Sequence, residues 1–369
     1  MPSARTPHVI HYLPAIRLSD GGVVRAVLDL CAVTALRGHR VTLATFDASD
    51  APPDLSVLAL PGKPLSGGLL PAAALGAAHA ELAEASFLHL HGPWDPAHVQ
   101  LARAARMAGV PYGVTAHGML DAWSMAQKPL KKRIFLAMFG RRVLQGAAWL
   151  HCTAEGEAEQ VRRLLPKARV VVAPLVFDTR PFLGLPAPLP PLEMPRVLFL
   201  SRIHPKKGLE KLIEACILLQ QRGRPVALGI AGTGEPAYVE RLAAEVALRK
   251  VDAEFIGMVS GEEKVRVLRS ADVFALPTSQ ENFGLALVEA MACGTPVITT
   301  KGVDIWPELK AAGAEILEVG ASPSEWTDAI GAMLARADRA ELGARGRAWV
   351  LDALAPAKVV GMYEALYGV

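Results

Sequence analysis

The sequence predicts an α/β protein with parallel sheets, divided into two domains. Short apolar strands alternate with helical patterns in both halves of the chain, as in repeated βαβ units. The chain has 369 residues, which is too long for one ordinary core. A proline-rich segment near the middle follows neither the helical nor the strand period, and we place the domain boundary there.

These patterns divide the chain into four parts. We expect an N-terminal domain over 1–178, a proline-rich linker over 179–196, a C-terminal domain over 197–353 and a final helix over 354–369.

The composition and charge of the chain argue against several classes of protein. A net charge of +3 with 20% charged residues gives no reason to expect nucleic acid as a partner. No apolar run is long enough to span a membrane, and Met1 to Pro7 lack the apolar core of a signal peptide, so we expect a cytoplasmic protein. The cysteines are far apart in the sequence and suggest reduced core thiols rather than disulfides or zinc ligands. They are Cys31, Cys152, Cys216 and Cys293.

The first half begins with a βαβ unit. The pattern predicts strands at Val9–Leu13 and Val41–Thr45, with a helix at Val23–Leu36 between them. Gly21 and Gly22 precede the helix and would let a ligand approach the backbone. The loop has no Gly-x-Gly-x-x-Gly, so a plain tight turn explains it equally well.

Two later strands end in histidine-containing segments. His89 and His91 close one strand, and His117 follows the next, at the carboxyl edge where α/β sheets bind ligands. His89-x-His91 has the spacing of metal ligands, but the sequence offers no third ligand beside it, which favours structural or substrate-contacting roles. His117 is the better candidate for substrate contact, and a buried histidine bonded to backbone is its alternative.

Residues 128–144 are both basic and apolar. Such a helix could lie at an anionic membrane surface. An ordinary half-buried helix with a solvated face is the slightly better explanation. Strands at Trp149–Thr153 and Val170–Ala173, with a helix from Glu155 between them, complete the first half.

The second half restarts with a basic loop. A strand at Val197–Leu200 leads into Ser201–Gly208, which contains Arg202 and Lys207, and then into a helix that ends at Gly223. A forked Arg and a Lys at a strand-to-helix turn suit a diphosphate. A solvated basic loop is the alternative.

Gly232-x-Gly234 with Ala237 matches a dinucleotide-binding fingerprint, and Glu254 follows at a fitting distance. The match opens the second βαβ unit of its half rather than the first. We therefore interpret it as a turn beside the ligand. The loop at Gly257 and Met258 could offer backbone groups to a base.

Residues 271–300 carry the strongest functional signal. A buried strand is followed by a loop with Glu281 and by an apolar helix over Gly284–Cys293, whose one charge is Glu289. A buried carboxylate needs a partner or a ligand. Free helix amides between two carboxylates suit a nucleoside diphosphate sugar. The alternative is a solvated Glu281 and a Glu289 paired with a core arginine.

These residues resemble the retaining glycosyltransferases of family 4, which belong to glycosyl transferases group 1. The most specific part is Glu281-x₇-Glu289 with the following Glu-Ala-Met-Ala-Cys-Gly-Thr-Pro-Val, and next Ser201-Arg202 with Lys207-Gly208. Gly21-Gly22, His117-Gly118-Met119-Leu120-Asp121 and Thr153-x-Glu155 add to it. The resemblance implies the GT-B fold, in which two Rossmann-like domains face a central cleft, with the acceptor on the N-terminal domain.

The resemblance also implies residue roles. The catalytic set would be His117, Arg202, Lys207 and Glu281. The donor-binding set combines the residues that the resemblance implies with the loop residues Gly232, Gly257 and Met258 described above. Its members would be Gly21, Gly22, Arg202, Lys207, Gly232, Gly257, Met258, Glu281, Asn282, Phe283, Gly284, Leu285 and Glu289. Arg202 and Lys207 would hold the diphosphate and Glu289 the ribose. Glu281 would hold the sugar, which His117 would contact near the reaction centre.

Two segments depart from the family pattern. Pro174-Leu175-Val176 stands where Pro-Asn-Gly is frequent, and Ala355-Pro356-Ala357 replaces an often aromatic stretch before the final helix, which the family returns to the first domain. The chain has no Asp-x-Asp, which agrees with the metal-independent transfer that the resemblance implies. We expect no cofactor.

The sequence thus predicts a hexosyltransferase that moves a sugar from a UDP- or GDP-linked donor, with retention. The predicted acceptor is a saccharide or polyprenyl-linked saccharide of surface polysaccharide or O-antigen assembly. Residues 128–144 are a candidate contact with the inner face of the cytoplasmic membrane. The alternatives are a noncatalytic sugar-nucleotide-binding protein of the same fold and an NAD-linked oxidoreductase resting on Gly232-x-Gly234.

Overall fold

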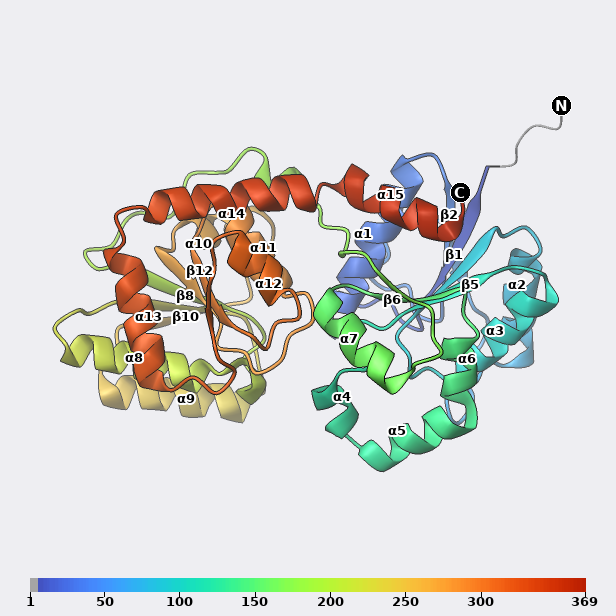
Figure 1. Cartoon of the computed structure of the whole chain (residues 1–369), viewed down its shortest axis with the longest axis horizontal. Helices are drawn as coiled ribbons and strands as arrows, with labels where there is room; N and C mark the ends of the chain where they lie inside the picture. Colours follow the sequence, from blue (N-terminus) through green and yellow to red (C-terminus); the bar gives the residue numbers. More distant parts are fainter. Residues whose placement is uncertain (1–5) are drawn as a thin grey trace. The chain divides into compact units, whose positions relative to one another are not determined.

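The computed structural model describes residues 6–369. Residues 1–5, which belong to the segment in which we expect no signal peptide, lie outside the described part. The chain divides into two compact units (Figure 1). One holds the chain up to Phe177 together with Pro356–Val369, and the other holds Asp178–Ala355. Each unit is an α/β layer structure around one parallel sheet. The predicted α/β class with two parallel sheets is confirmed.

The sheet of the first unit has the strand order β3-β2-β1-β4-β5-β6-β7, and all of its pairings are parallel. The order reverses between β1 and β4, and ligands of such sheets bind at the carboxyl ends of strands near such a switch point. The strands are β1 (His8–Tyr12), β2 (Arg40–Thr45), β3 (Val57–Ala59), β4 (Phe87–His91), β5 (Tyr112–Thr115), β6 (Trp149–Cys152) and β7 (Val170–Val172).

Helices cover both faces of this sheet (Figure 1). They are α1 (Gly22–Leu36), α2 (Ala72–Leu82), α3 (Ala97–Met107), α4 (Ala122–Ala126), α5 (Pro129–Phe135), α6 (Arg141–Gln145), α7 (Glu155–Leu164) and α15 (Pro356–Tyr367). Sequence reasoning missed β3, α2, α3 and α4. It also expected one helix over 128–144, which the structure divides into α5, a π-helical turn at Leu136–Gly140 and α6.

The C-terminal helix α15 packs in the first unit. Tyr363 and Tyr367 on this helix are buried with Phe87 and Trp149 of the sheet. The Trp149 indole donates a hydrogen bond to the carbonyl of Leu366, at 2.8 Å. The ring of Trp149 lies where a side chain on Gly113 would stand, because a Cβ there would come within 2.4 Å of the ring. The sheet therefore needs glycine at that position of β5.

The second unit has the strand order β10-β9-β8-β11-β12-β13, again with parallel pairings throughout. Its strands are β8 (Arg196–Leu200), β9 (Ala227–Ala231), β10 (Ala253–Gly257), β11 (Val273–Ala275), β12 (Val297–Thr300) and β13 (Glu315–Leu317). Its helices are α8 (Leu209–Gln221), α9 (Pro236–Arg249), α10 (Gly261–Arg269), α11 (Leu285–Ala292), α12 (Trp306–Ala311), α13 (Pro323–Ala335) and α14 (Arg339–Ala353).

The proline-rich segment packs on the second unit. The Arg347 guanidinium donates a hydrogen bond to the carbonyl of Phe182 at 2.6 Å, and Arg269 donates one to Leu185 at 3.3 Å. Residues 179–196, which the sequence suggests as a linker, thus belong to the unit that follows them. Within residues 6–369, none of the helices combines the length and the apolar character that crossing a membrane requires.

Candidate functional site

The loop after β8 gathers positive charge in the second unit. Lys207 is buried at the end of a short 3-10 turn, whereas Arg202 is exposed. Burial, followed by the charges of Arg202, Lys206 and Lys207, lowers the pKa of His204. The charges of Arg202, Lys206 and Lys207 therefore all act at His204, in the same loop. A cationic loop of this kind suits phosphate oxygens.

Lys207 forms an ion pair with Glu281, at the centre of the predicted donor site. The amide of Ser279 donates a hydrogen bond to the Lys206 carbonyl at 2.9 Å, which joins the two loops. Gly208 has a φ of 70°, and a Cβ there would lie 2.3 Å from the carbonyl oxygen of Pro277. The loops thus pack backbone to backbone, and Glu281 is a paired side chain rather than a solvated one.

Helix α11 begins at Leu285, shortly after Glu281 in the sequence. Gly284, with a φ of 70°, is the N-cap, and no described side chain caps it. The amides of Leu287 and Val288 bond to the Gly284 carbonyl. This leaves the amides of Leu285 and Ala286 without an intrahelical acceptor. Free amides and the helix dipole together favour an anion at this end.

Glu289 has a protein partner. The Lys264 ammonium group donates to its carboxylate at 2.5 Å, and both side chains are partly buried. The sequence predicted a partner or a ligand for this carboxylate, and Lys264 is the partner that sequence reasoning missed. The two residues lie on different helices, α10 and α11, so no local spacing could indicate the pair. No described contact joins Glu289 to Glu281.

The Gly232-x-Gly234 pattern follows from the close approach of the basic loop. A Cβ on Gly232 would lie 2.0 Å from the Ser201 carbonyl oxygen, and one on Gly234 would lie 2.2 Å from that of Ile203. Ile203 also donates an amide hydrogen bond to Thr233, at 2.8 Å. Both glycines are therefore required for loop packing, with no need for a dinucleotide.

The remaining donor-site candidates in this unit divide into framework and surface residues. The Gly257 carbonyl accepts a hydrogen bond from the Gly232 amide at 2.7 Å, and Phe283 is buried. The Asn282 side chain donates to Asp304 at 3.3 Å. Met258 is 71% exposed, so its side chain is available to a ligand.

In the first unit, Gly21 and Gly22 mark the start of α1. Gly21 has a φ of 103° and is the N-cap, without a capping side chain among the described residues. Both glycines are exposed. No described contact links them to His117.

His117 lies in a strained turn after β5. It has a φ of 51°, and Gly118 follows with a φ of 71°. The fully buried Glu157 holds this turn, because its carboxylate accepts hydrogen bonds from the Gly118 amide at 2.5 Å and the Thr153 amide at 2.7 Å. Sequence reasoning quoted the exposed Glu155 and missed Glu157. The available signal was an acidic residue on the apolar face of α7, beside Ala158 and Val161.

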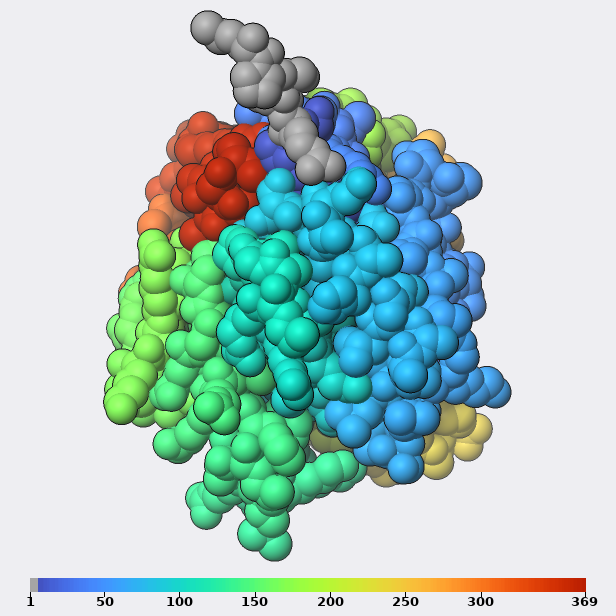
Figure 2. All heavy atoms as spheres, turned by 90° about the vertical axis from the view of Figure 1, so that its right-hand side faces the viewer, coloured from blue at the N-terminus to red at the C-terminus, as the bar shows by residue number. Residues whose placement is uncertain are grey.

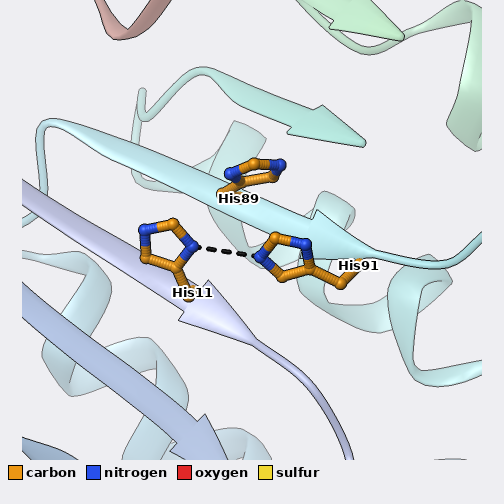
Figure 3. A group of neighbouring side chains, drawn as sticks. All are labelled: His11, His89 and His91. Atoms are coloured by element: carbon orange, nitrogen blue, oxygen red, sulfur yellow. Dashed lines mark hydrogen bonds between the residues drawn. The ribbon is translucent and has the colours of Figure 1, made fainter. Parts of the chain in front are cut away.

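His117 is the outer end of a chain of hydrogen-bonded imidazoles. Its Nε2 lies 3.1 Å from Nδ1 of His91. Nε2 of His91 in turn lies 3.0 Å from Nδ1 of His11, a contact that Figure 3 shows as a dashed line. The Nε2 atom of His11 is buried and has no described partner. The chain therefore has two tautomeric states. If the His11 Nε2 carries a proton, Nδ1 of His117 is an acceptor; if it does not, Nδ1 of His117 is a donor.

The imidazoles of this chain are neutral. Burial lowers the pKa of His11 to about 3, and burial followed by the charge of His151 lowers that of His117 to about 3. Burial, and then the neighbouring His89 and His11, hold the pKa of His91 well below its usual value. Neutral imidazoles fit the shared-proton arrangement, since three neutral rings carry three protons, two for the bonds between the rings and one for an outer nitrogen.

His11, His89 and His91 also form a group with metal-binding donors, since one ring nitrogen of each lies within 4.8 Å of the others. His11 is the third histidine that the sequence pattern of His89-x-His91 did not reveal. It comes from β1, whose residue His11 pairs with His89 of β4 (Figure 3).

Hydrogen bonding at His89 does not fit a metal. The Ala173 carbonyl can only accept, so Nε2 of His151 donates to it at 2.8 Å, and Nδ1 of His151 accepts from Thr115 at 3.0 Å. The Thr115 oxygen then accepts from Nε2 of His89 at 2.6 Å, and Nδ1 of His89 accepts from the Tyr367 hydroxyl at 2.9 Å. Both nitrogens of His89 are occupied, so these residues form a hydrogen-bond network.

Comparison with known proteins agrees with this architecture. The model of the glycosyl transferases group 1 family matches residues 186–349, and that of the glycosyl transferase 4-like domain matches residues 21–175. A D-inositol 3-phosphate glycosyltransferase of Xylanimonas cellulosilytica is 29% identical, over 94% of this chain and 93% of the relative. Its counterpart in Mycolicibacterium smegmatis is 36% identical over 40% of this chain and 34% of the relative.

Solved structures of other proteins share the fold. Anabaena HepE in complex with UDP has a TM-score of 0.80 at 18% identity, with 99% of this chain and 100% of that chain covered. WaaG, a glycosyltransferase involved in lipopolysaccharide biosynthesis, has a TM-score of 0.74 at 18% identity, with 98% and 100% covered. The two family models together span most of both units. The chain therefore belongs to the group 1 glycosyltransferases, with a 4-like N-terminal domain and the GT-B fold.

Proposed function

We propose that this transferase moves a hexose from UDP-sugar to an acceptor, with retention at the anomeric carbon and without a metal or cofactor. The observation that carries the proposal is the Lys207–Glu281 ion pair, joined to the cationic loop and followed in the chain by the uncapped start of α11. UDP is favoured because Anabaena HepE was crystallised with UDP and with UDP-glucose.

The donor contacts follow from the chemistry of each group. Arg202 and Lys207 supply positive charge, and the free amides of α11 supply hydrogen bonds, so together they would hold the diphosphate. Glu289 would accept hydrogen bonds from the ribose while Lys264 balances its charge. Glu281, fixed by Lys207, would accept hydrogen bonds from the sugar hydroxyls.

In the proposed reaction the bond between the anomeric carbon and the phosphate oxygen breaks, and its electron pair passes to the phosphate. The acceptor oxygen forms its bond to the carbon on the same face and gives its proton to the departing phosphate oxygen. Arg202, Lys207 and the helix amides stabilise the charge that develops on the diphosphate. His117 would contact the sugar, and its hydrogen-bonding character is set by the imidazole chain.

The proposed acceptor is a saccharide or a polyprenyl-linked saccharide of surface polysaccharide assembly. The basic and apolar segment 128–144 favours a lipid-linked acceptor, because Leu130, Ile134 and Met138 are at least half exposed among its lysines and arginines. This segment would also place the enzyme at the inner face of the cytoplasmic membrane. The D-inositol 3-phosphate relatives make inositol phosphate the competing acceptor to test.

The first experiment is calorimetric titration of the full chain with UDP, GDP and ADP in the presence of a chelator. We expect UDP to bind, and Lys207→Ala to weaken it by about tenfold to a hundredfold, since charged hydrogen bonds contribute about 1.5–3 kcal/mol. The exposed Lys310, on α12, gives a matched control. Equal UDP affinity in both variants would refute the assigned donor site.

Turnover distinguishes the enzyme from a noncatalytic sugar-nucleotide-binding protein of the same fold. Wild-type protein with UDP-glucose should release UDP, and faster with a suitable acceptor. Nuclear magnetic resonance of the product then reports whether the anomeric configuration is retained. Binding of UDP-sugar without hydrolysis or transfer to any acceptor would favour the binding protein.

A further inference from the structure

A pocket lined by apolar and lysine side chains lies in the first unit beside α5. Its volume is about 700 Å³, within the usual range for small-molecule sites. Its lining includes three aromatic side chains and three lysines: Trp94, Phe135, Phe139, Lys128, Lys131 and Lys132. None of the described lining residues is acidic.

One wall of the pocket is held rigidly. The Lys132 ammonium group lies 4.9 Å from the centre of the Trp94 ring and donates to the Ser124 carbonyl at 2.6 Å. The Trp94 indole donates to the Met119 carbonyl at 3.0 Å, and its ring packs against Phe135 at a centroid distance of 6.0 Å. Because these contacts fix Trp94 and Lys132, the pocket needs little rearrangement to receive a ligand.

The pocket is distinct from the outer apolar surface of the same segment. Leu130, Ile134 and Met138 are 71%, 50% and 63% exposed, and none of them lines the pocket. The segment from α4 to α6 stands out at the lower edge of the first unit in Figure 2, where it is coloured green. Some residues of this segment thus line a pocket, and others are exposed apolar side chains outside it.

Charge complementarity selects the ligand. An apolar cavity with lysines in its lining and no acidic lining residue among those described favours a molecule with an apolar chain and an anionic head. A single cavity of this size suits one chain. These features describe a single-chain lipid phosphate better than a two-chain phospholipid.

We propose that this pocket binds the lipid part of the acceptor, an isoprenyl chain that ends in phosphate. The phosphate would lie at Lys128 and Lys131, and the chain would contact Phe135 and Phe139. The inference rests on the proposed transfer to a lipid-linked saccharide and names the group that recognises its lipid.

The test is calorimetric titration of the full chain with geranylgeranyl phosphate, kept below its micelle concentration. We expect one saturable site. Phe139→Ser and Lys131→Gln should each weaken binding by about tenfold, the former by loss of apolar contact and the latter by loss of a phosphate contact. The neighbouring Met138→Ser and Arg142→Gln, which do not line the pocket, are the matched controls and should leave the affinity unchanged.

Two results would overturn the pocket assignment. One is equal affinity in the pocket variants and the controls, or no saturable binding at all. The other is binding to phosphatidylglycerol vesicles alone, lost in Met138→Ser, which would assign the segment to bulk membrane contact. UDP titration of the same samples separates the two proposals, because failure of the donor site removes UDP binding and failure of the pocket does not. Thermal unfolding of each variant shows that it is folded.

Discussion

At the residue scale, His91 connects His117 to the interior. It bonds to His117 on one side and to His11 on the other, so the position of the proton on the His117 ring is coupled to that on the His11 ring. We predict that His91→Phe lowers kcat/KM by about tenfold, equivalent to one lost hydrogen bond of about 1.4 kcal/mol in the transition state. His91→Gln, which keeps a donor and an acceptor, should restore part of the activity.

Two further readouts separate positioning by His91 from simple loss of the fold. UDP affinity should stay unchanged in His91→Phe, since the proposed UDP contacts lie in the second unit. Nitrogen chemical shifts of the His117 ring should also change, because its Nε2 loses the hydrogen bond to His91 that couples it to His11. Wild-type kcat/KM in His91→Phe would exclude any role for the imidazole chain in transfer.

Glu157 is the second residue with a specific consequence. Its buried carboxylate accepts from Gly118 and Thr153, which holds the left-handed turn at His117. We predict that Glu157→Gln lowers the free energy of unfolding by about 1.5–3 kcal/mol and lowers activity, because the new amide group faces backbone donors. Glu155→Gln, at an exposed residue paired with Arg162, should cost less than about 1 kcal/mol. Urea unfolding monitored by fluorescence measures the free energy of unfolding of both variants.

These residues also show what sequence reasoning could reach. Arg202, Lys207, Glu281 and Glu289 stand in contiguous loops and one helix, so residue type and spacing predicted a common site. Their partners did not follow from spacing: Lys264 is on another helix from Glu289, and Glu157 lies far along the chain from Gly118. Such pairs depend on how sheets and helices stack, which no local period encodes.

At the element scale, the basic loop depends on the turn after β9. Gly234 has an ordinary φ, so only steric contact with the Ile203 carbonyl oxygen requires glycine there. We predict that Gly234→Ala displaces the loop, lowers the free energy of unfolding by about 1–3 kcal/mol and weakens UDP binding. Gly320→Ala, at a position where a Cβ meets no neighbour within 4 Å, is the control. Unchanged UDP affinity in Gly234→Ala would show that the loop tolerates the shift.

Element boundaries show a second limit of the sequence. Most strands appear within one or two residues of their predicted ends, because continuous apolar runs mark buried parallel strands. The helix expected over 128–144 begins only after Lys128, which has a φ of 53°, and a π-helical turn separates α5 from α6. The periodic placement of apolar residues continues through the turn, so the period alone could not reveal it.

At the scale of the whole molecule, buried histidines are concentrated in the first unit. Burial lowers the pKa of His11, His98 and His117 to about 3 and that of His151 to about 4, and His89 and His91 are lowered as well. In the unfolded chain these groups take up protons near pH 6.5. The second unit contains only His204, which is exposed.

This asymmetry predicts acid-induced unfolding of the first unit before the second. A lowered histidine pKa means that the unfolded state binds more protons below pH 6.5, so stability is complete above that pH and falls as the pH decreases toward 3. Each such histidine contributes a slope of about 1.4 kcal/mol per pH unit in that window.

Urea unfolding at pH 7.5 and at pH 5.5, monitored by hydrogen exchange in each unit, measures the effect. We expect the first unit to lose protection at lower urea as the pH falls, with little change in the second. Parallel losses in both units would show that the histidine network does not control acid stability.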